Sequence, residues 1–103
     1  MKLIWDNKAM EEFQHVAGYI KRSFGVKRKN VFLREVRHAV EMLVVNPYMG
    51  ALDPNLSDRS KSYRSILINR LNKMVYYVDD DVLTIIAFWD CRRDDKTQTQ
   101  HLI

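Results

Sequence analysis

Halfway along the chain, the spacing of apolar residues changes from a helical period to a strand period. Up to residue 45, apolar side chains recur at intervals of three and four, which places them on one face of an amphipathic helix. The first such set is Ala9, Met10, Phe13, Val16, Ala17, Ile20 and Phe24, and the second is Phe32, Val36, Ala39, Val40 and Leu43. After residue 62, β-branched and aromatic residues form three short runs that are typical of strands. Two helices followed by strands predict a fold of the α+β class.

Three residues predict where the two helices begin and end. Asp6 follows a short apolar run at residues 3–5, which is expected to form a strand, and its carboxylate can cap a helix by accepting backbone N–H bonds. Gly25 suits the end of the first helix, because glycine takes a left-handed conformation at little cost. Pro47 must stop the second helix, since proline disfavours helical backbone in the residue before it. The sequence therefore predicts an antiparallel helical hairpin joined by a short basic turn.

The second half of the chain predicts a small antiparallel sheet. Residues 48–62 lack periodicity and are expected to form a loop, and residues 63–68, 73–78 and 82–89 are expected to form three strands. The third of these runs is almost continuously apolar, so it is expected to lie centrally in the sheet.

The predicted elements assemble into one two-layer domain with the order β-α-α-β-β-β. The chain has 103 residues, a common size for a single domain, and residues 94–103 read as a polar C-terminal tail. One set of side chains is expected to pack the hairpin onto the sheet: Phe13, Ile20, Phe32, Val36 and Val40 from the helices, with Val75 and Ile85 from the strands.

Cysteine and histidine usage argues against metal and disulfide chemistry. A single cysteine, Cys91, can form neither an internal disulfide nor a thiolate zinc site, which favours a cytoplasmic location. His15, His38 and His101 lie far apart in the sequence, and the acidic run at residues 79–81 reads as a solvated turn. No apolar run approaches the length of a membrane span. We expect no cofactor, no metal and no membrane partner.

Positive charge is concentrated in the first half of the chain. The net charge is +4, and residues 1–50 carry nine Lys and Arg against five acids, whereas residues 51–103 carry eight of each. Five of the cations fall within nine positions: Lys21, Arg22, Lys27, Arg28 and Lys29. Such a cluster can bind phosphates or an acidic protein, and it is also compatible with a solvated helix end.

A second group of cations belongs to the predicted sheet. Arg64 and Lys73 lie on the first two strands of the meander, and Arg92 and Arg93 follow the third. Because Arg64 and Lys73 flank one hairpin turn, they are expected to be close to cross-strand partners and to converge on one face. Converging cations could hold a phosphodiester and stabilise charge that develops on it. The alternative is ordinary surface ion pairing with acids such as Asp90, Asp94 or Asp95.

Four short motifs, in this order, resemble the RelE/ParE toxin superfamily over residues 1–97. They are Asn46-Pro47-x-x-Gly50, Tyr63-Arg64-Ser65-Ile66, Met74-Val75-Tyr76-Tyr77 and Phe88-Trp89-Asp90-Cys91-Arg92-Arg93-Asp94. The resemblance implies the growth-inhibiting half of a bacterial type II toxin–antitoxin module, of the kind linked to plasmid stabilisation. It also implies a cognate antitoxin with an acidic, partly disordered tail and a toxin–antitoxin hetero-oligomer. The candidate partner-binding residues are Lys21, Arg22, Lys27, Arg28, Lys29, Arg92 and Arg93.

The superfamily has two branches, and the residues favour one of them. RelE-like members cut mRNA in the ribosomal A site, and ParE-like members poison DNA gyrase. Arg64, Lys73 and Arg92 fall where the nucleases have cations, but Ile66 stands in place of a second strand lysine. No tyrosine or His-Tyr pair follows Arg92, although RNA cleavage through the 2′-OH needs a group that moves protons. The Trp-Asp-x-Arg-Arg ending is similar to the Phe-Asp-x-Arg pattern of ParE-like members.

Three functional hypotheses therefore remain open. The favoured one is a non-enzymatic ParE-like toxin that inhibits DNA gyrase or a related topoisomerase. The second is a metal-free, ribosome-dependent mRNA endonuclease with Arg64, Lys73 and Arg92 as its catalytic residues. The third is an inactive module that retains only antitoxin binding.

Overall fold

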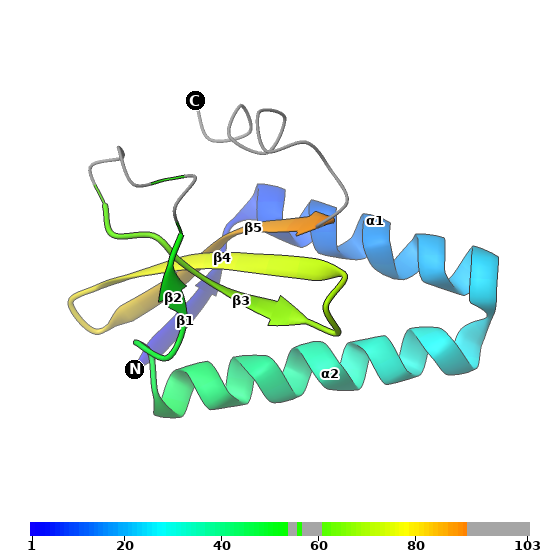
Figure 1. Ribbon diagram of the computed structural model, residues 1–103, viewed down its shortest axis with the longest axis horizontal. Helices are drawn as coiled ribbons and strands as arrows, with labels where there is room; N and C mark the ends of the chain where they lie inside the picture. Colours follow the sequence, from blue (N-terminus) through cyan, green and yellow to red (C-terminus); the bar gives the residue numbers. More distant parts are fainter. Residues whose placement is uncertain (54–55, 57–60, 91–103) are drawn as a thin grey trace.

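The computed structural model describes residues 1–53, 56 and 61–90, and it places a helical hairpin against one face of a sheet (Figure 1). The elements in chain order are β1 (Lys2–Trp5), α1 (Asn7–Phe24), α2 (Val26–Val45), β2 (Ala51–Leu52), β3 (Arg64–Ile68), β4 (Asn72–Asp79) and β5 (Val82–Asp90). The turn of the hairpin extends past the ends of the strands (Figure 1). The α+β class and the order of the predicted elements are confirmed.

Three helix ends lie where their local causes predicted, but the short basic turn expected between the helices is wrong, because Lys27, Arg28 and Lys29 belong to the first turn of α2. The Asp6 carboxylate accepts a hydrogen bond from the backbone N–H of Lys8 at 3.1 Å, which caps the first turn of α1. Gly25 follows α1 with a φ of 94°, in the region that favours glycine, and α2 begins at the next residue. The second helix ends at Val45, two residues before Pro47.

The sheet has five strands in the order β1-β5-β4-β3-β2. β1 runs parallel to β5, and the other neighbouring strands are antiparallel. β5 is an interior strand, which suits its apolar sequence, although the middle position belongs to β4. β2 lies at an edge, so the expectation of a loop throughout residues 48–62 is wrong at Ala51–Leu52. Two residues are too few for an alternating pattern to be detectable in the sequence.

A short connection sets the register between β3 and β4. Asn69 and Arg70 both have left-handed φ values, 50° and 66°, as the central residues of a type I′ turn must. The Asn69 side chain also accepts a hydrogen bond from the N–H of Leu71 at 3.1 Å. Three residues thus separate the paired Ile68 and Asn72, and every cross-strand pair of β3 and β4 follows from this spacing.

The main core fills the space between the helices and one face of the sheet. Phe32, Val36, Tyr76 and Ile85 are buried in it, and Phe13, Ile20 and Val40 pack against it as predicted. The prediction that Val75 also faces the helices is wrong. Met74 and Tyr76 point toward the helices, and because side chains alternate along a strand, Val75 points the other way.

Part of the outer face of the sheet is covered by a second, smaller cluster. Val75, Ala87 and Trp89 are buried there beneath Leu56, and Tyr63 packs against the same cluster. The segment that follows β2 is tied down by backbone hydrogen bonds: the Asp53 N–H donates to the Tyr63 carbonyl at 2.9 Å. The part of the outer face around Val75 and Trp89 is therefore covered, whereas Leu67 on the same face is exposed.

Candidate functional site

Arg64 holds the connection between α2 and β2. Its Nη1 donates to the Gly50 carbonyl at 2.8 Å and lies 3.5 Å from the Tyr48 carbonyl. Its guanidinium carbon is 5.3 Å from the centre of the Tyr48 ring, within cation–π range. Arg64 is the first residue of β3 and pairs with Tyr76, so it shares the helix side of the sheet with Tyr76. These contacts give the side chain a structural role, because they hold the connection after α2 against the end of the sheet.

Gly50 and Tyr76 explain why this connection needs a glycine. The buried Tyr76 hydroxyl accepts a hydrogen bond from the Gly50 N–H at 2.9 Å. A Cβ added at Gly50 would lie 2.6 Å from that hydroxyl and 2.9 Å from the Ser65 carbonyl oxygen, closer than atoms can approach. Burial raises the pKa of Tyr76, although the bond from Gly50 and the charge of Arg64 act in the opposite direction.

Lys73 forms a largely buried ion pair on the outer face. Its Nζ lies 2.9 Å from Oδ2 of Asp53, and the carboxylate is fully buried while 14% of the lysine side chain is exposed. The same ammonium lies 5.2 Å from the centre of the Trp89 ring. The ion pair joins the segment that follows β2 to the middle of the sheet, so Lys73 also has a clear structural role.

The predicted convergence of Arg64 and Lys73 is wrong. Arg64 is paired with Tyr76, and Lys73 is paired with Leu67, so the two cations are not cross-strand neighbours. They lie on opposite faces of the sheet, because Arg64 shares a face with Tyr76 and Lys73 shares one with Val75. Arg92, Arg93 and the other C-terminal candidates, Cys91, Asp94, Asp95 and His101, lie outside the described residues.

The ion-pair partner of Lys73 is Asp53, an acid that the sequence did not suggest. Asp53 is twenty positions away and lies in a stretch without periodicity, so no local pattern links it to Lys73. The one feature of the sequence that distinguishes Asp53 is that it directly follows residues 42–52, which carry no charged side chain.

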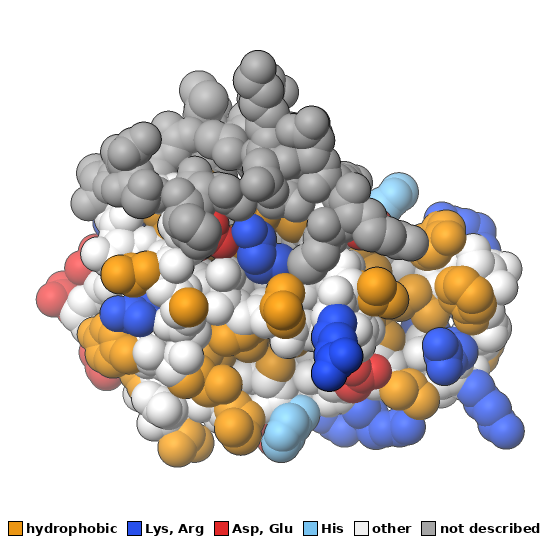
Figure 2. Space-filling model, viewed as in Figure 1, with side chains coloured by type: hydrophobic (Ala, Val, Ile, Leu, Met, Phe, Trp, Pro, Cys, Tyr) orange, Lys and Arg blue, Asp and Glu red, His pale blue; other side chains and the backbone are white. Residues whose placement is uncertain are grey.

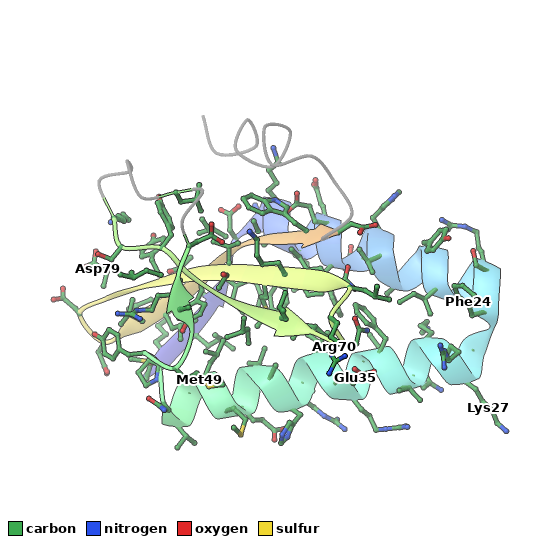
Figure 3. All side chains as sticks on the ribbon, in the orientation of Figure 1. Phe24, Lys27, Glu35, Met49, Arg70 and Asp79 are labelled. Carbon is green, nitrogen blue, oxygen red and sulfur yellow. The ribbon has the colours of Figure 1, made fainter. Side chains whose placement is uncertain are left out.

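The five clustered cations meet at the turn of the helical hairpin, which we call the basic tip. Lys21 and Arg22 lie in the last turn of α1, and Lys27, Arg28 and Lys29 lie in the first turn of α2. None of them takes part in the ion pairs found among the described residues. In Figure 2 blue side chains gather at this end of the helices, and in Figure 3 Lys27 points away from the body of the molecule.

The charges of the basic tip suit an anionic partner. Cations are favourable at the C-terminal end of α1, but those in the first turn of α2 oppose the positive end of its helix dipole. This arrangement costs stability unless negative charge from outside binds there.

A groove of about 360 Å³ adjoins the basic tip, between α1 and the end of the sheet. Its lining residues are His15, Val16, Tyr19, Ile20, Phe24, Asn69, Leu71, Asn72 and Asp90. Tyr19 and Phe24 are exposed, with ring centres 6.3 Å apart. Exposed aromatic side chains beside cations are typical of protein–protein interfaces.

No metal site is found in the part of the chain that the structure describes. His15 and His38 are exposed, and no three His, Cys, Asp or Glu side chains there could hold a metal ion. The acids at residues 79–81 are exposed at a turn, as predicted. None of the described helices is long and apolar enough to cross a bilayer.

Comparison with solved structures finds proteins of the same fold. The chain is similar in structure to the chromosomal ParDE toxin–antitoxin system from P. aeruginosa, with a TM-score of 0.71 and 18% identity over 87% of this chain and 95% of that one. It is also similar to the YoeB/ParE toxin from Agrobacterium tumefaciens, with a TM-score of 0.61 and 18% identity over 87% and 98% of the two chains. A third similar structure is that of YoeB from Staphylococcus aureus, with a TM-score of 0.57 and 17% identity over 84% of this chain and 92% of that one.

These structural likenesses establish the fold, and a sequence comparison establishes the family. No curated protein sequence matches the chain. Residues 3–95 match the family model described as the ParE toxin of the type II toxin–antitoxin system parDE. The match covers nearly the whole chain, and the protein therefore belongs to the ParE toxin family.

Proposed function

We propose that this ParE-family toxin inhibits growth by binding DNA gyrase, and that it does so without cutting RNA. The proposal rests on one observation. Arg64 and Lys73, which stand where the RelE-like nucleases have cations, are both bound to other groups of this chain. Arg64 donates to the Gly50 carbonyl, and Lys73 pairs with Asp53, on opposite faces of the sheet. Two cations placed in this way do not form one phosphate site.

The chemistry of RNA cleavage supports the same conclusion. Stabilising a phosphorane-like transition state requires cations that are directed at the same phosphate before the reaction begins. The reaction also requires a group that accepts the proton of the 2′-OH. A toxin that acts by binding a protein needs neither feature, because an exposed surface with suitable charge and shape is enough. Arg92 and Arg93, which follow β5, are proposed to belong to that surface.

The test measures both activities of the full chain in parallel. We expect the protein to abolish supercoiling by gyrase or to trap gyrase–DNA cleavage complexes, and to leave ribosome-bound mRNA intact in primer extension. Arg92→Ala and Arg93→Ala should weaken the effect on gyrase, whereas Lys61→Ala, which changes an exposed cation elsewhere, should not. Codon-positioned mRNA cuts that disappear in a folded Lys73→Ala variant would instead establish a nuclease. Absence of both activities would leave an inactive antitoxin-binding module.

Membership of the ParE family implies a cognate antitoxin of the ParD type. We propose that an acidic segment of this antitoxin binds the basic tip, with an apolar side chain seated in the adjoining groove. Opposite charges at an interface chiefly accelerate association, and the effect weakens as salt rises. A disordered segment that folds on binding could cover both features at once.

Charge reversal tests this part of the proposal. Lys21→Glu, Arg22→Glu and Lys27→Glu together should slow association with the cognate antitoxin by about 10-fold or more at low salt. The matched control reverses three exposed cations that lie outside both the basic tip and the groove, Lys2, Arg37 and Lys61, and so changes the net charge equally. Equal slowing by both triple variants would show that only net charge matters and would exclude a specific role for the basic tip.

A further inference from the structure

Positive charge is segregated in one part of the chain. Residues 13–34 contain six Lys and Arg and no Asp or Glu. The other 81 residues carry eleven Lys and Arg against thirteen acids, so the whole positive excess lies in this one run. Exposed helix faces usually mix charges of both signs, because opposite charges three or four residues apart stabilise the helix. A run of one sign over this length favours a binding surface for a polyanion.

The positive charge extends from the basic tip along the outer side of α2, which we call the basic face. Its four residues are Lys27, Asn30, Arg34 and Arg37, which recur at intervals of three and four and therefore share one side of the helix. All four side chains are exposed, and Asn30, Arg34 and Arg37 line one shallow hollow together with Leu33. In Figure 1 α2 runs along the lower edge of the molecule with the sheet on one side of it only, and Figure 2 shows blue side chains along that edge.

The cations of the basic face have no counter-charge from this chain. Neither Arg34 nor Arg37 takes part in an ion pair found among the described residues. They lie three residues apart on the helix, where like charges repel each other. Glu35 is only half exposed and lies about 100° around the helix from Arg34, and Glu41 lies beyond the C-terminal end of the face. An anion bound between the two guanidinium groups would remove their repulsion.

The composition of the basic face favours a nucleic acid over a protein or a membrane. Lysine is depleted in protein–protein interfaces, whereas Lys, Arg and Asn are side chains that contact phosphates. An amphipathic helix binds a membrane surface through its apolar side, and the apolar side of α2 is packed against the sheet. A negatively charged polymer is the ligand that matches a row of cations on an otherwise polar helix face.

The shape of the basic face favours duplex DNA among the nucleic acids. Single strands bind through exposed aromatic side chains on which the bases stack, and no aromatic residue lines the hollow of the basic face. An α-helix with its side chains is about 10–12 Å wide, which matches the major groove of B-DNA at about 12 Å. The major groove of duplex RNA is too narrow for it.

We propose that the basic face of α2 binds duplex DNA through its phosphates. Lys27 and Arg37 are ten residues apart on the helix, or about 15 Å, so the three cations of the face can reach about three phosphates. Each such contact releases counterions, so the logarithm of the binding constant falls by about 0.9 per phosphate for each decade of salt. Binding at this face does not depend on the cellular target, although it would hold a toxin that acts on gyrase beside the DNA.

Fluorescence anisotropy of a short labelled DNA duplex, titrated with the full chain at several salt concentrations, tests the site. We expect binding at about 50 mM salt, with a logarithmic slope of about −3. Arg34→Gln with Arg37→Gln should weaken binding about 10-fold or more and make the slope shallower by about 2. The matched control is Lys2→Gln with Lys61→Gln, which removes two exposed cations elsewhere and changes the net charge equally. Thermal unfolding followed by circular dichroism should show both double variants folded.

Four results would overturn the proposal. The first is a wild-type chain that does not bind the duplex at low salt. The second is equal loss of affinity and slope in the two double variants, which would show that only net charge matters. The third is tighter binding to single-stranded DNA or to duplex RNA of the same length. The fourth is an Arg34→Gln, Arg37→Gln variant that binds DNA as the wild type does but associates more slowly with the antitoxin, which would assign the face to an acidic protein. All of these measurements omit gyrase, so their failure is distinct from a failure of the proposed target.

Discussion

Replacing Lys73 by methionine separates a structural role of this cation from a role in binding phosphate. Methionine fills a similar volume but removes the ammonium that lies 2.9 Å from the fully buried Asp53 carboxylate. Removing one partner of a buried ion pair typically costs about 3–5 kcal/mol, because the remaining charge stays in a poorly solvated site. Lys73 retains 14% exposure, which admits some water, so we expect about 3 kcal/mol. At about 4–8 °C per kcal/mol, the melting temperature should fall by roughly 12–24 °C.

A double-mutant cycle shows whether this cost belongs to the ion pair. Lys73→Met, Asp53→Asn and the double variant are compared by chemical denaturation, and the double variant should lose less stability than the sum of the two single losses, by about 1–3 kcal/mol. Lys61→Met is the matched control, since Lys61 pairs with Asp79 at the exposed surface at 3.6 Å and should cost under about 1 kcal/mol. Strictly additive losses, or a Lys73→Met variant that melts with the wild type, would refute the reasoning.

Three further changes test the packing around the sheet. Phe32→Ala should cost roughly 3–5 kcal/mol in a thermal melt, because the ring is buried with its centre 5.8 Å from both Phe13 and Phe88; an unchanged melting temperature would contradict the packing. Gly50→Ala should cost about 1–3 kcal/mol in urea denaturation, since its Cβ would lie 2.6 Å from the Tyr76 hydroxyl. Burial holds the pKa of Tyr76 above 10.0, so the unfolded chain releases its phenol proton first, and the free energy of unfolding should fall as pH rises above that value. In the Tyr76→Phe variant, this part of the fall in the free energy of unfolding at alkaline pH should be absent.

Both ends of α1 and the end of α2 could be predicted from local causes, whereas the start of α2 at Val26 lies within the expected basic turn. Asp6 caps α1, Gly25 separates the two helices, and Pro47 excludes helical backbone just beyond α2. The sheet was harder because β4 is apolar on both faces. With Val75 and its neighbours all buried, the sequence contains no alternation that tells which side chains face the helices. The sequence pattern predicted the order of the elements along the chain but not the orientation of each side chain.

One residue in the connection between β3 and β4 decides how Arg64 and Lys73 are placed. Three residues separate the paired Ile68 and Asn72. Because side chains alternate along each strand, this spacing puts Arg64 and Lys73 on opposite faces of the sheet. A connection shorter by one residue would reverse the face of every β4 side chain relative to β3 and bring the two cations to one side, as the sequence had suggested. The sequence predicted a turn here but not its length, because Arg70 takes a left-handed φ of 66°, which arginine adopts rarely. The register itself is therefore an argument against a shared phosphate site, independent of the acid that neutralises Lys73.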